Sequence, residues 1–322
     1  MSLKRTIYRL SFQVFKLFSR AGLYILPAHY YVPIADINRL EKTKESWAVK
    51  SSLPGVHSDL DEQAARMKDI CLPFQKEYEG NHTYKTAVNE HFGSGYGYIE
   101  AQALHGFLRH LHPKRIIEVG SGISTFCMRH ALKINREKSG RADHGHTAQL
   151  TGVEPHPSEK LKKMDGIHLI DKPVQLIPPE TFANLDAGDF LFIDSTHTIK
   201  PGGDVNYLIL EILPRLKKGV VVHFHDIFLP YDYPRNVLSS YFQWMETSLL
   251  RAFLINNSKA RILFCLSQLH YGRPDVLKEV FPDYVRAPDS NGLEPDGRLQ
   301  PESGHYPASI YIEISGSAES KT

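Results

Sequence analysis

From residue 115 onward, short apolar runs alternate with longer amphipathic stretches, and this alternation limits the folds open to the chain. Seven runs have the length and β-branched or aromatic content of buried strands: 115–119, 150–154, 167–170, 190–194, 220–225, 261–266 and 309–314. Helices are expected between most of them, at 124–134, 157–164, 204–216 and 237–256. The pattern predicts an α/β fold: a doubly wound, mostly parallel seven-stranded sheet with helices on both faces.

Two segments interrupt the alternation. The polar, Gly- and His-rich stretch 136–149 is expected to be a surface insertion before the second strand. The Pro-, Gly- and Asp-rich stretch 273–306 delays the last strand and is expected to cover part of a site. The last strand is expected to insert antiparallel to its neighbours.

Residues 1–90 are expected to form an N-terminal helical extension, and residues 91–322 the α/β domain. A Ser/Asp cap and an acidic first turn predict a helix from about Ser58 to Ile70. Another helix is expected at 98–111, whereas 30–55, rich in proline and charge, is expected to be irregular.

The first thirty-five residues carry five basic side chains and no acid before Asp36. On a helical wheel, one face is apolar and the opposite face basic, a layout typical of helices that lie on anionic membranes. An apolar stripe of this kind also suits packing on the rest of the chain or on a second subunit. Both interpretations stay open, so peripheral membrane contact through residues 1–26 and a homo-oligomer are alternative expectations.

Composition excludes several classes of protein. A formal net charge of +2 supplies no field for gripping nucleic acid, so no DNA or RNA partner is expected. The three cysteines are widely spaced in apolar runs, which predicts buried thiols in a reducing compartment. No run is long and apolar enough to span a membrane, so a cytoplasmic protein is expected, with peripheral attachment at the inner membrane as the alternative.

The first strand runs directly into Gly120-Ser121-Gly122 and a helix. Glycines at this point allow a tight turn and close approach of a ligand, and the helix start adds free N–H groups. Glu118 lies just before the turn, where a carboxylate suits a cationic ligand better than a phosphate. Glu154 ends the second strand, a position from which an acid binds ribose hydroxyls.

This combination of Glu-x-Gly-x-Gly with later acidic strand ends resembles the class I S-adenosylmethionine-dependent methyltransferases, over about residues 90–315. More narrowly, it resembles the bacterial family that includes metal-dependent macrolide-sugar O-methyltransferases. The resemblance implies a Rossmann-like methyltransferase domain that binds S-adenosylmethionine. It places the methionine part against the turn, the ribose at the second strand end, and a Gly-rich closing segment over the cofactor, with the site residues Glu118, Gly120, Ser121, Gly122, Glu154, Tyr96 and Gly97.

Two further strands end in polar clusters, Asp194-Ser-Thr-His197 and His223-Phe-His225-Asp226. Strand ends that are neighbours in a sheet lie close together, so these side chains could surround one divalent cation, Mg²⁺ or Mn²⁺. The resembled family has an Asp ligand and a His base three positions later, which Asp194 and His197 match. It has two carboxylates where this chain has His225-Asp226. Asp194, His225 and Asp226 are therefore the predicted metal ligands and His197 the predicted base, whereas His223 is expected to be structural. The alternative is that His225 is the base and no metal binds.

The function predicted from sequence is metal-assisted O-methylation of a hydroxyl on a small molecule, such as a saccharide. Aromatic residues after the fifth strand, at 228–234 and 240–246, suit such an acceptor. One alternative keeps the fold and the metal but makes the enzyme a hydroxylase. Another is a membrane-surface binding protein with a vestigial cofactor pocket.

Overall fold

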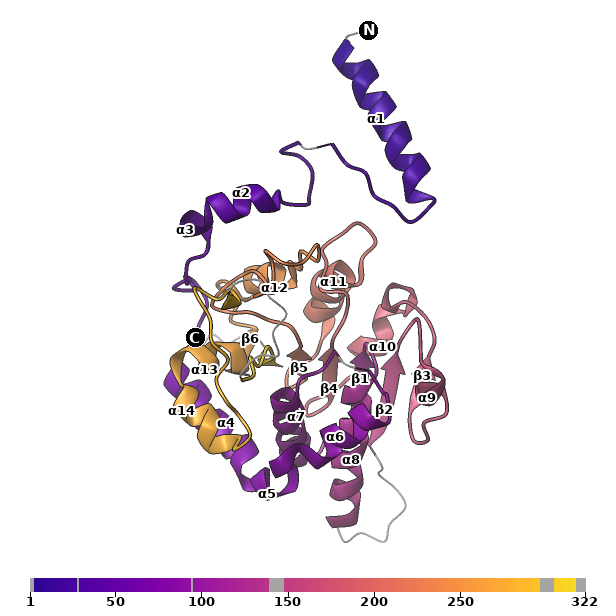
Figure 1. The fold of residues 1–322 in the computed structure, drawn as a ribbon. Coiled ribbons are helices and arrows are strands. Elements are labelled where there is room, and N and C mark those ends of the chain that lie inside the picture. The colour runs from indigo at the N-terminus through magenta and orange to yellow at the C-terminus, as the bar shows by residue number, and fades with distance from the viewer. Residues whose placement is uncertain (1–2, 28, 94, 139–147, 296–303, 317–322) are drawn as a thin grey trace, which may run out of the picture. The chain divides into compact units, whose positions relative to one another are not determined.

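The computed structural model describes residues 3–27, 29–93, 95–138, 148–295 and 304–316 (Figure 1). It divides into two compact units, Met1–Ala48 and Val49–Thr322. The sequence placed the end of the helical extension at residue 90, so the two boundaries differ. Residues 49–90 join the second unit because α4 (Leu60–Cys71) packs on the edge strand β6 (Ala260–Cys265) and α6 (His82–Asn89) packs on α8 (Ile123–Lys138).

The first unit contains α1 (Leu3–Ser19), α2 (Ile37–Lys42) and α3 (Lys44–Trp47). The expectation of irregular structure over 30–55 is wrong for α2 and α3. Asp36 starts α2, because its carboxylate accepts a hydrogen bond from the Arg39 N–H at 3.3 Å. Among the described residues, no helix combines the length and the apolar content needed to cross a bilayer.

The second unit is built on one seven-stranded sheet of order β3-β2-β1-β4-β5-β7-β6. Its strands fall within one residue of the predicted ends of most runs: β1 (Arg115–Val119), β2 (Gln149–Val153), β3 (His168–Ile170), β4 (Phe190–Ile193), β5 (Val221–Phe224), β6 (Ala260–Cys265) and β7 (Ile310–Ile314). β1 to β5 are parallel, and β7 runs antiparallel to both β5 and β6. The predicted doubly wound sheet and its antiparallel last strand are confirmed.

Alternate side chains of the strands enter two hydrophobic cores, one on each face of the sheet. Ile116 and Phe190 point into the core formed with α4, α7 (Tyr98–Leu111) and α8. The opposite core packs against the helical segment 204–215 and α12 (Glu246–Leu254). Helices cover both faces of the sheet, so a ligand is expected to bind at the ends of the strands (Figure 1).

The predicted helices differ from the structure in two places. Residues 204–216 form a short α-helix, a π-helical turn and a 3₁₀ turn, and Pro214 stands in the 3₁₀ turn. The predicted helix over 237–256 is wrong before Glu246, because local bonds such as that from the Phe242 N–H to Ser240 Oγ replace helical ones. Most of the expected insertion at 136–149 lies outside the described residues, although α8 extends to Lys138.

One contact joins the end of β1 to the end of β4. Gly120 has a φ of +81°, and a Cβ at this position would lie 1.9 Å from the carbonyl oxygen of Asp194. The Asp194 N–H in turn donates to the Val119 carbonyl at 2.9 Å. Only glycine fits here, so the turn after β1 lies directly against the start of the loop after β4.

Replacing Gly120 with alanine should therefore cost far more stability than the same change at Gly188. Gly188 has a similar φ of +84° but has open space around its Cβ position. We expect Gly188→Ala to lower the free energy of unfolding by about 1 kcal/mol, from backbone strain alone, and Gly120→Ala to lower it by about 3 kcal/mol or more. Urea denaturation of both variants measures the difference, and equal losses would contradict the close approach.

Candidate active site

The carboxyl ends of β1, β2, β4 and β5 meet at one edge of the sheet, where ligands of open α/β sheets bind. The glycine turn follows β1 and leads into α8, so its backbone N–H groups lie at the start of a sixteen-residue helix. The carbonyl of Phe92 lies within 2.8 Å of where a Gly122 Cβ would be. The Gly-rich segment before α7 therefore does reach the turn, through Phe92.

Glu118 is completely buried under the start of α8. Its two carboxylate oxygens accept hydrogen bonds from Ser124 Oγ at 2.6 Å and Thr125 Oγ1 at 2.7 Å. Burial raises the pKa of Glu118 to about 7, against the opposing effect of these hydroxyls. In this arrangement Glu118 fastens the first turn of α8 beneath the glycine turn.

Glu154 follows β2 and is half-buried beside the glycine turn. Its carboxylate accepts hydrogen bonds from the Ser121 N–H at 3.3 Å and from the His156 N–H at 2.8 Å. The Glu154 N–H donates to the Ile170 carbonyl of β3, which holds the residue at the sheet edge. The structure thus brings Ser121 and Glu154 together at one end of the sheet.

Asp194, His197, His225 and Asp226 form a compact cluster after β4 and β5, in which one donor atom from each lies within 4.8 Å of all the others. His197 Nε2 lies 3.2 Å from Asp194 Oδ1 and 3.5 Å from Asp226 Oδ2. His225 Nδ1 lies 3.3 Å and 3.4 Å from the same two oxygens. Two imidazoles and two carboxylates thus converge on one point, a donor set that could hold a divalent cation.

The backbone at this cluster is strained. His197 has a φ of +56° and Asp226 a φ of +52°, in the left-handed region that side chains other than glycine seldom adopt. Such conformations cost free energy and occur preferentially at functional sites. The strain turns both side chains back toward the cluster.

In the cluster, the carboxylates raise the pKa of the histidines and the histidines lower the pKa of Asp194. Burial would lower the pKa of His197, but Asp194 and Glu246 outweigh it and raise the pKa to about 10. Burial would likewise raise the pKa of Asp194, but His225 and His197 hold it below its usual value. Without a cation, the positive charge in the cluster is therefore carried by protons on imidazole.

Glu246 is the residue behind His197. Its Oε2 lies 2.7 Å from His197 Nδ1, and Glu246 is only 1% exposed. It begins α12, and its N–H donates to the His197 carbonyl at 3.2 Å. The sequence analysis did not single out Glu246, since nothing in the local pattern pairs it with a residue 49 positions earlier.

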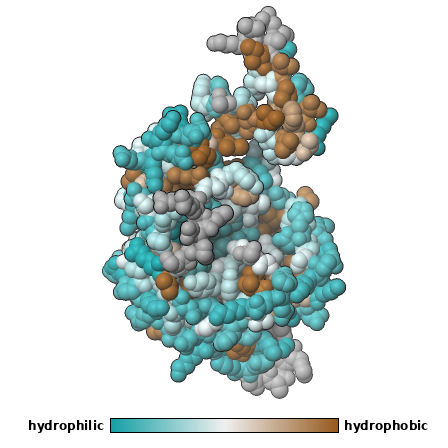
Figure 2. Space-filling model, viewed as in Figure 1, coloured by the Kyte–Doolittle hydropathy of each residue, from teal (hydrophilic) through white to brown (hydrophobic). Residues whose placement is uncertain are grey.

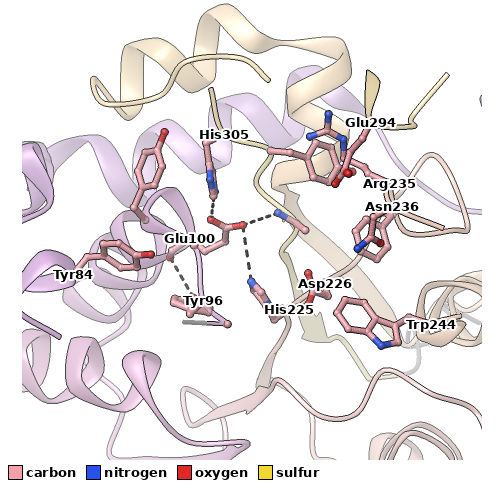
Figure 3. Close-up of a pocket in the computed structure, with 16 residues that line it drawn as sticks. Tyr84, Tyr96, Glu100, His225, Asp226, Arg235, Asn236, Trp244, Glu294 and His305 are labelled. Atoms are coloured by element: carbon pink, nitrogen blue, oxygen red, sulfur yellow. Dashed lines mark hydrogen bonds and ion pairs between the residues drawn. The ribbon is translucent and has the colours of Figure 1, made fainter. Parts of the chain in front are cut away.

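A cavity of about 380 Å³ opens beside the cluster, with His225 and Asp226 in its wall (Figure 3). Tyr84, Tyr98, Trp244 and Tyr306 supply aromatic surface, and polar side chains also line it: Glu100, Arg235, Asn236, Glu294 and His305. The segment 273–306 contributes to the wall, as expected, although it also contains the helix α14 (Pro274–Val280).

Glu100 bridges two histidines in this wall (Figure 3). One of its oxygens lies 2.5 Å from His305 Nε2, and the other accepts from the Ala308 N–H at 2.8 Å and lies 3.9 Å from His225 Nε2. Burial would raise the pKa of Glu100, but His305 and His225 outweigh it and hold the pKa at about 2. Sequence analysis missed this residue, although an acid in the otherwise apolar first turns of α7 was an available signal.

Tyr96 and Gly97 lie in the cavity wall beside the cluster. The Tyr96 ring lies 4.9 Å from the His225 ring, and its hydroxyl donates to the Glu100 carbonyl at 3.3 Å. His223, on the same face of β5, stacks on Phe192 at 4.3 Å and is fully buried. Burial lowers its pKa well below the usual value, so it is a neutral aromatic-core residue.

The raised pKa of Glu118 predicts a pH dependence of stability. Between pH 4.5 and about 7, the folded protein keeps a proton that the unfolded chain releases, so stability falls as pH rises through this window. The loss should be at most about 3 kcal/mol. Urea denaturation at pH 5 and pH 8 measures it, and Glu118→Gln, which cannot titrate, should remove this component. An unchanged dependence in Glu118→Gln would contradict the assignment.

Part of the chain is similar to known proteins. Residues 117–227 match the model of a family described as a methyltransferase domain. An uncharacterised protein of Archaeoglobus fulgidus is 25% identical over 170 residues, which are 50% of this chain and 73% of that protein.

Two solved methyltransferase structures align with the chain at low sequence identity. One is the methyltransferase PaMTH1 of Podospora anserina, bound to S-adenosylhomocysteine. It is 16% identical, the alignment covers 74% of this chain and 93% of that one, and the TM-score is 0.35. The other is the O-methyltransferase TomG of Streptomyces achromogenes, bound to S-adenosylmethionine. It is 12% identical, the alignment covers 79% of this chain and 99% of that one, and the TM-score is 0.42. The family match covers about a third of the chain, from within β1 to Ile227, so this part of the chain, which carries the glycine turn and the cluster, is similar to a methyltransferase domain.

Proposed function

We propose that the chain methylates an oxygen atom of a small molecule, using S-adenosylmethionine and a divalent metal ion held by the cluster after β4 and β5. The observation that carries this proposal is the position of the cluster. The backbone of Asp194 lies directly against Gly120, so a methyl donor on the glycine turn and an acceptor at the cluster would be neighbours.

The cofactor site is proposed at the glycine turn, with Gly120, Ser121 and Gly122 allowing close approach and Glu154 taking the ribose hydroxyls. The contacts of Glu118 favour an indirect role, in which it supports the turn through Ser124 and Thr125. Tyr96 and Gly97 lie nearer the cluster than sequence reasoning expected. Their proposed role is to separate the cofactor from the cavity beside His225.

The residues present fit a metal ion. Neither ring nitrogen of His225 forms a well-aligned hydrogen bond with the described residues, although the side chain is buried and carboxylates lie within 4 Å of both nitrogens. Buried polar groups without partners are rare, and a missing ligand explains this one. Asp194, His225 and Asp226 would hold the ion. A bound divalent ion would lower the pKa of a coordinated hydroxyl and orient it toward the methyl donor.

His197 was predicted to be the base, and its contacts favour a different role. Its Nδ1 faces Glu246 and its Nε2 faces both aspartates, so neither nitrogen points into the cavity. We therefore assign His197 to the metal site as a fourth ligand through Nε2. The proton of the acceptor hydroxyl would then pass to the paired side chains of Glu100 and His305 in the cavity wall.

The acceptor is proposed to be a hydroxylated small molecule such as a saccharide. The cavity offers aromatic faces for stacking a ring, from Trp244 and Tyr84, beside polar side chains such as Asn236 that can bond hydroxyls (Figure 3). The alternative hydroxylase function draws on the same donor set, because two histidines and a carboxylate also suit iron. Product formation that requires iron and oxygen but no S-adenosylmethionine would favour it.

The substitutions Asp194→Ala and His197→Ala should abolish methyl transfer without removing cofactor binding. We expect turnover to fall by a factor of roughly 100 or more, measured as S-adenosylmethionine-dependent methylation across a panel of hydroxylated small molecules. Calorimetry should show cofactor affinity within a factor of about three of the unchanged chain, since neither side chain contacts the proposed cofactor residues. Asp186→Asn, a carboxylate change in a surface ion pair with Lys217, is the control.

Retained turnover in both variants would contradict the proposed cluster. Loss of cofactor affinity would instead transfer these residues to the cofactor site. If the unchanged chain fails to bind S-adenosylmethionine at all, the proposed enzyme gives way to a binding protein with a vestigial pocket.

A separate proposal concerns the first unit, which we expect to attach to anionic membranes through α1. Apolar side chains one helical turn apart on α1 are exposed, among them Ile7 at 58%, Leu10 at 67% and Leu17 at 64%. Residues 1–35 combine an apolar helix face with an opposite basic face and contain no acid, which suits a negatively charged lipid surface. Figure 2 shows the hydrophobic colouring of this segment.

Leu10→Ser in the full chain should weaken binding to vesicles of phosphatidylglycerol and phosphatidylcholine by roughly tenfold, because it removes apolar burial without changing charge. Gln13→Ser, on the polar face, is the matched control and should bind as the unchanged chain does. Vesicle sedimentation measures both. Equal vesicle binding by the two variants would contradict the proposal. It would also be contradicted if the chain self-associates and Leu10→Ser, but not Gln13→Ser, disrupts that association.

A further inference from the structure

We infer that Glu246 is a positioning residue that fixes which nitrogen of His197 binds metal, and that Glu100 does the same for His225. The two histidines would then bind one ion through different nitrogens, Nε2 of His197 and Nδ1 of His225. This inference rests on the proposed metal site and adds to it the groups that orient the ligands and the class of metal they select.

The contact of Glu246 with His197 determines a tautomer. Glu246 Oε2 lies 2.7 Å from His197 Nδ1, and an ionised carboxylate can only accept a hydrogen bond. Nδ1 therefore carries the hydrogen, and Nε2 is left to face Asp194 and Asp226 at 3.2 and 3.5 Å. In the metal-free protein a proton on Nε2 lies between the imidazole and the two carboxylates, and a metal ion would take the place of that proton.

The fold holds Glu246 and His197 together through their backbones as well. The Met245 and Glu246 N–H groups both donate to the His197 carbonyl, at 3.0 and 3.2 Å. The Trp244 ring lies 4.8 Å from the His197 ring and covers it. His197 is 5% exposed, so water does not compete with Glu246 for its Nδ1.

His225 has a related arrangement with the nitrogens reversed. Its Nδ1 faces the two aspartates at 3.3 and 3.4 Å, and its Nε2 lies 3.9 Å from Glu100, so Glu100 acts on this nitrogen through its charge and not through a hydrogen bond. Glu100 is 2% exposed and is itself held by His305 and by the Ala308 N–H. Each metal-facing imidazole is thus backed by one buried glutamate on the side away from the aspartates.

This outer pair of glutamates has a consequence for metal choice. Carboxylates behind ligating histidines fix the ring orientation and increase its basicity, which strengthens binding of metals that accept nitrogen. Mg²⁺ prefers oxygen ligands and gains little from an imidazole, whereas Mn²⁺, Co²⁺ and Zn²⁺ accept both kinds of donor. The site is therefore expected to bind Co²⁺ or Zn²⁺ at least about 100-fold more tightly than Mg²⁺.

The test is calorimetric titration of the full chain with Co²⁺, Zn²⁺ or Mg²⁺ alone. Glu246→Gln and Glu100→Gln should each weaken Co²⁺ binding by about 10- to 100-fold. Glu77→Gln is the matched control, because Glu77 also contacts a buried histidine, His105 at 3.0 Å, but lies outside the cluster. Its Co²⁺ affinity should equal that of the unchanged chain.

A second measurement does not depend on whether the variants fold. Nitrogen–proton correlation spectra of the Zn²⁺-loaded unchanged chain, labelled with ¹⁵N-histidine, should show one cluster histidine as the Nδ1–H tautomer and the other as the Nε2–H tautomer. Two histidines of the same tautomer, or Co²⁺ affinities unaltered in both glutamate variants, would overturn the inference. Absence of metal binding by the unchanged chain would overturn this inference and the metal in the proposed function together, whereas methyl transfer without metal would leave the remaining function standing.

Discussion

The close approach of Gly120 to the Asp194 carbonyl is the constraint on which the site depends. Parallel pairing of β1 with β4 brings the two strand ends side by side, and the missing side chain at Gly120 lets the loops that follow them touch. The proposed cofactor site lies around the loop after β1, and the cluster begins in the loop after β4. A shift of either strand would separate the two halves of the site.

Burial of many charges in a small volume is the second constraint. Asp194 and Asp226 lie at the centre of the cluster, and Glu100 and Glu246 lie behind its two histidines. Buried carboxylates are costly unless positive charge or hydrogen bonds compensate them. Protons on the two histidines provide that compensation in the metal-free protein, and a divalent ion would provide it in the same place.

The strands and the sheet could be predicted from sequence because they depend on local apolar runs, whose order also placed Asp194 and His225 at neighbouring strand ends. The helix expected over 237–245 is absent, although its side chains suit a helix, because Ser240 Oγ and the Asn236 carbonyl accept local hydrogen bonds from the Phe242 and Ser239 N–H groups and form turns. Glu246 and Glu100 were missed for another reason. Their partners, His197 and His305, lie far away in the sequence and meet them only through tertiary packing.

The described walls of the cavity come from parts of the chain that are distant in sequence: residues between 84 and 100, residues between 225 and 244, and Glu294 with residues 305–308. The glycine turn and Glu154, by contrast, lie within one β-α-β unit. Insertions or exchanges in any of the three stretches can reshape the cavity while leaving that unit untouched. A change in the shape of the cavity therefore need not disturb the turn at which the methyl donor is proposed to bind.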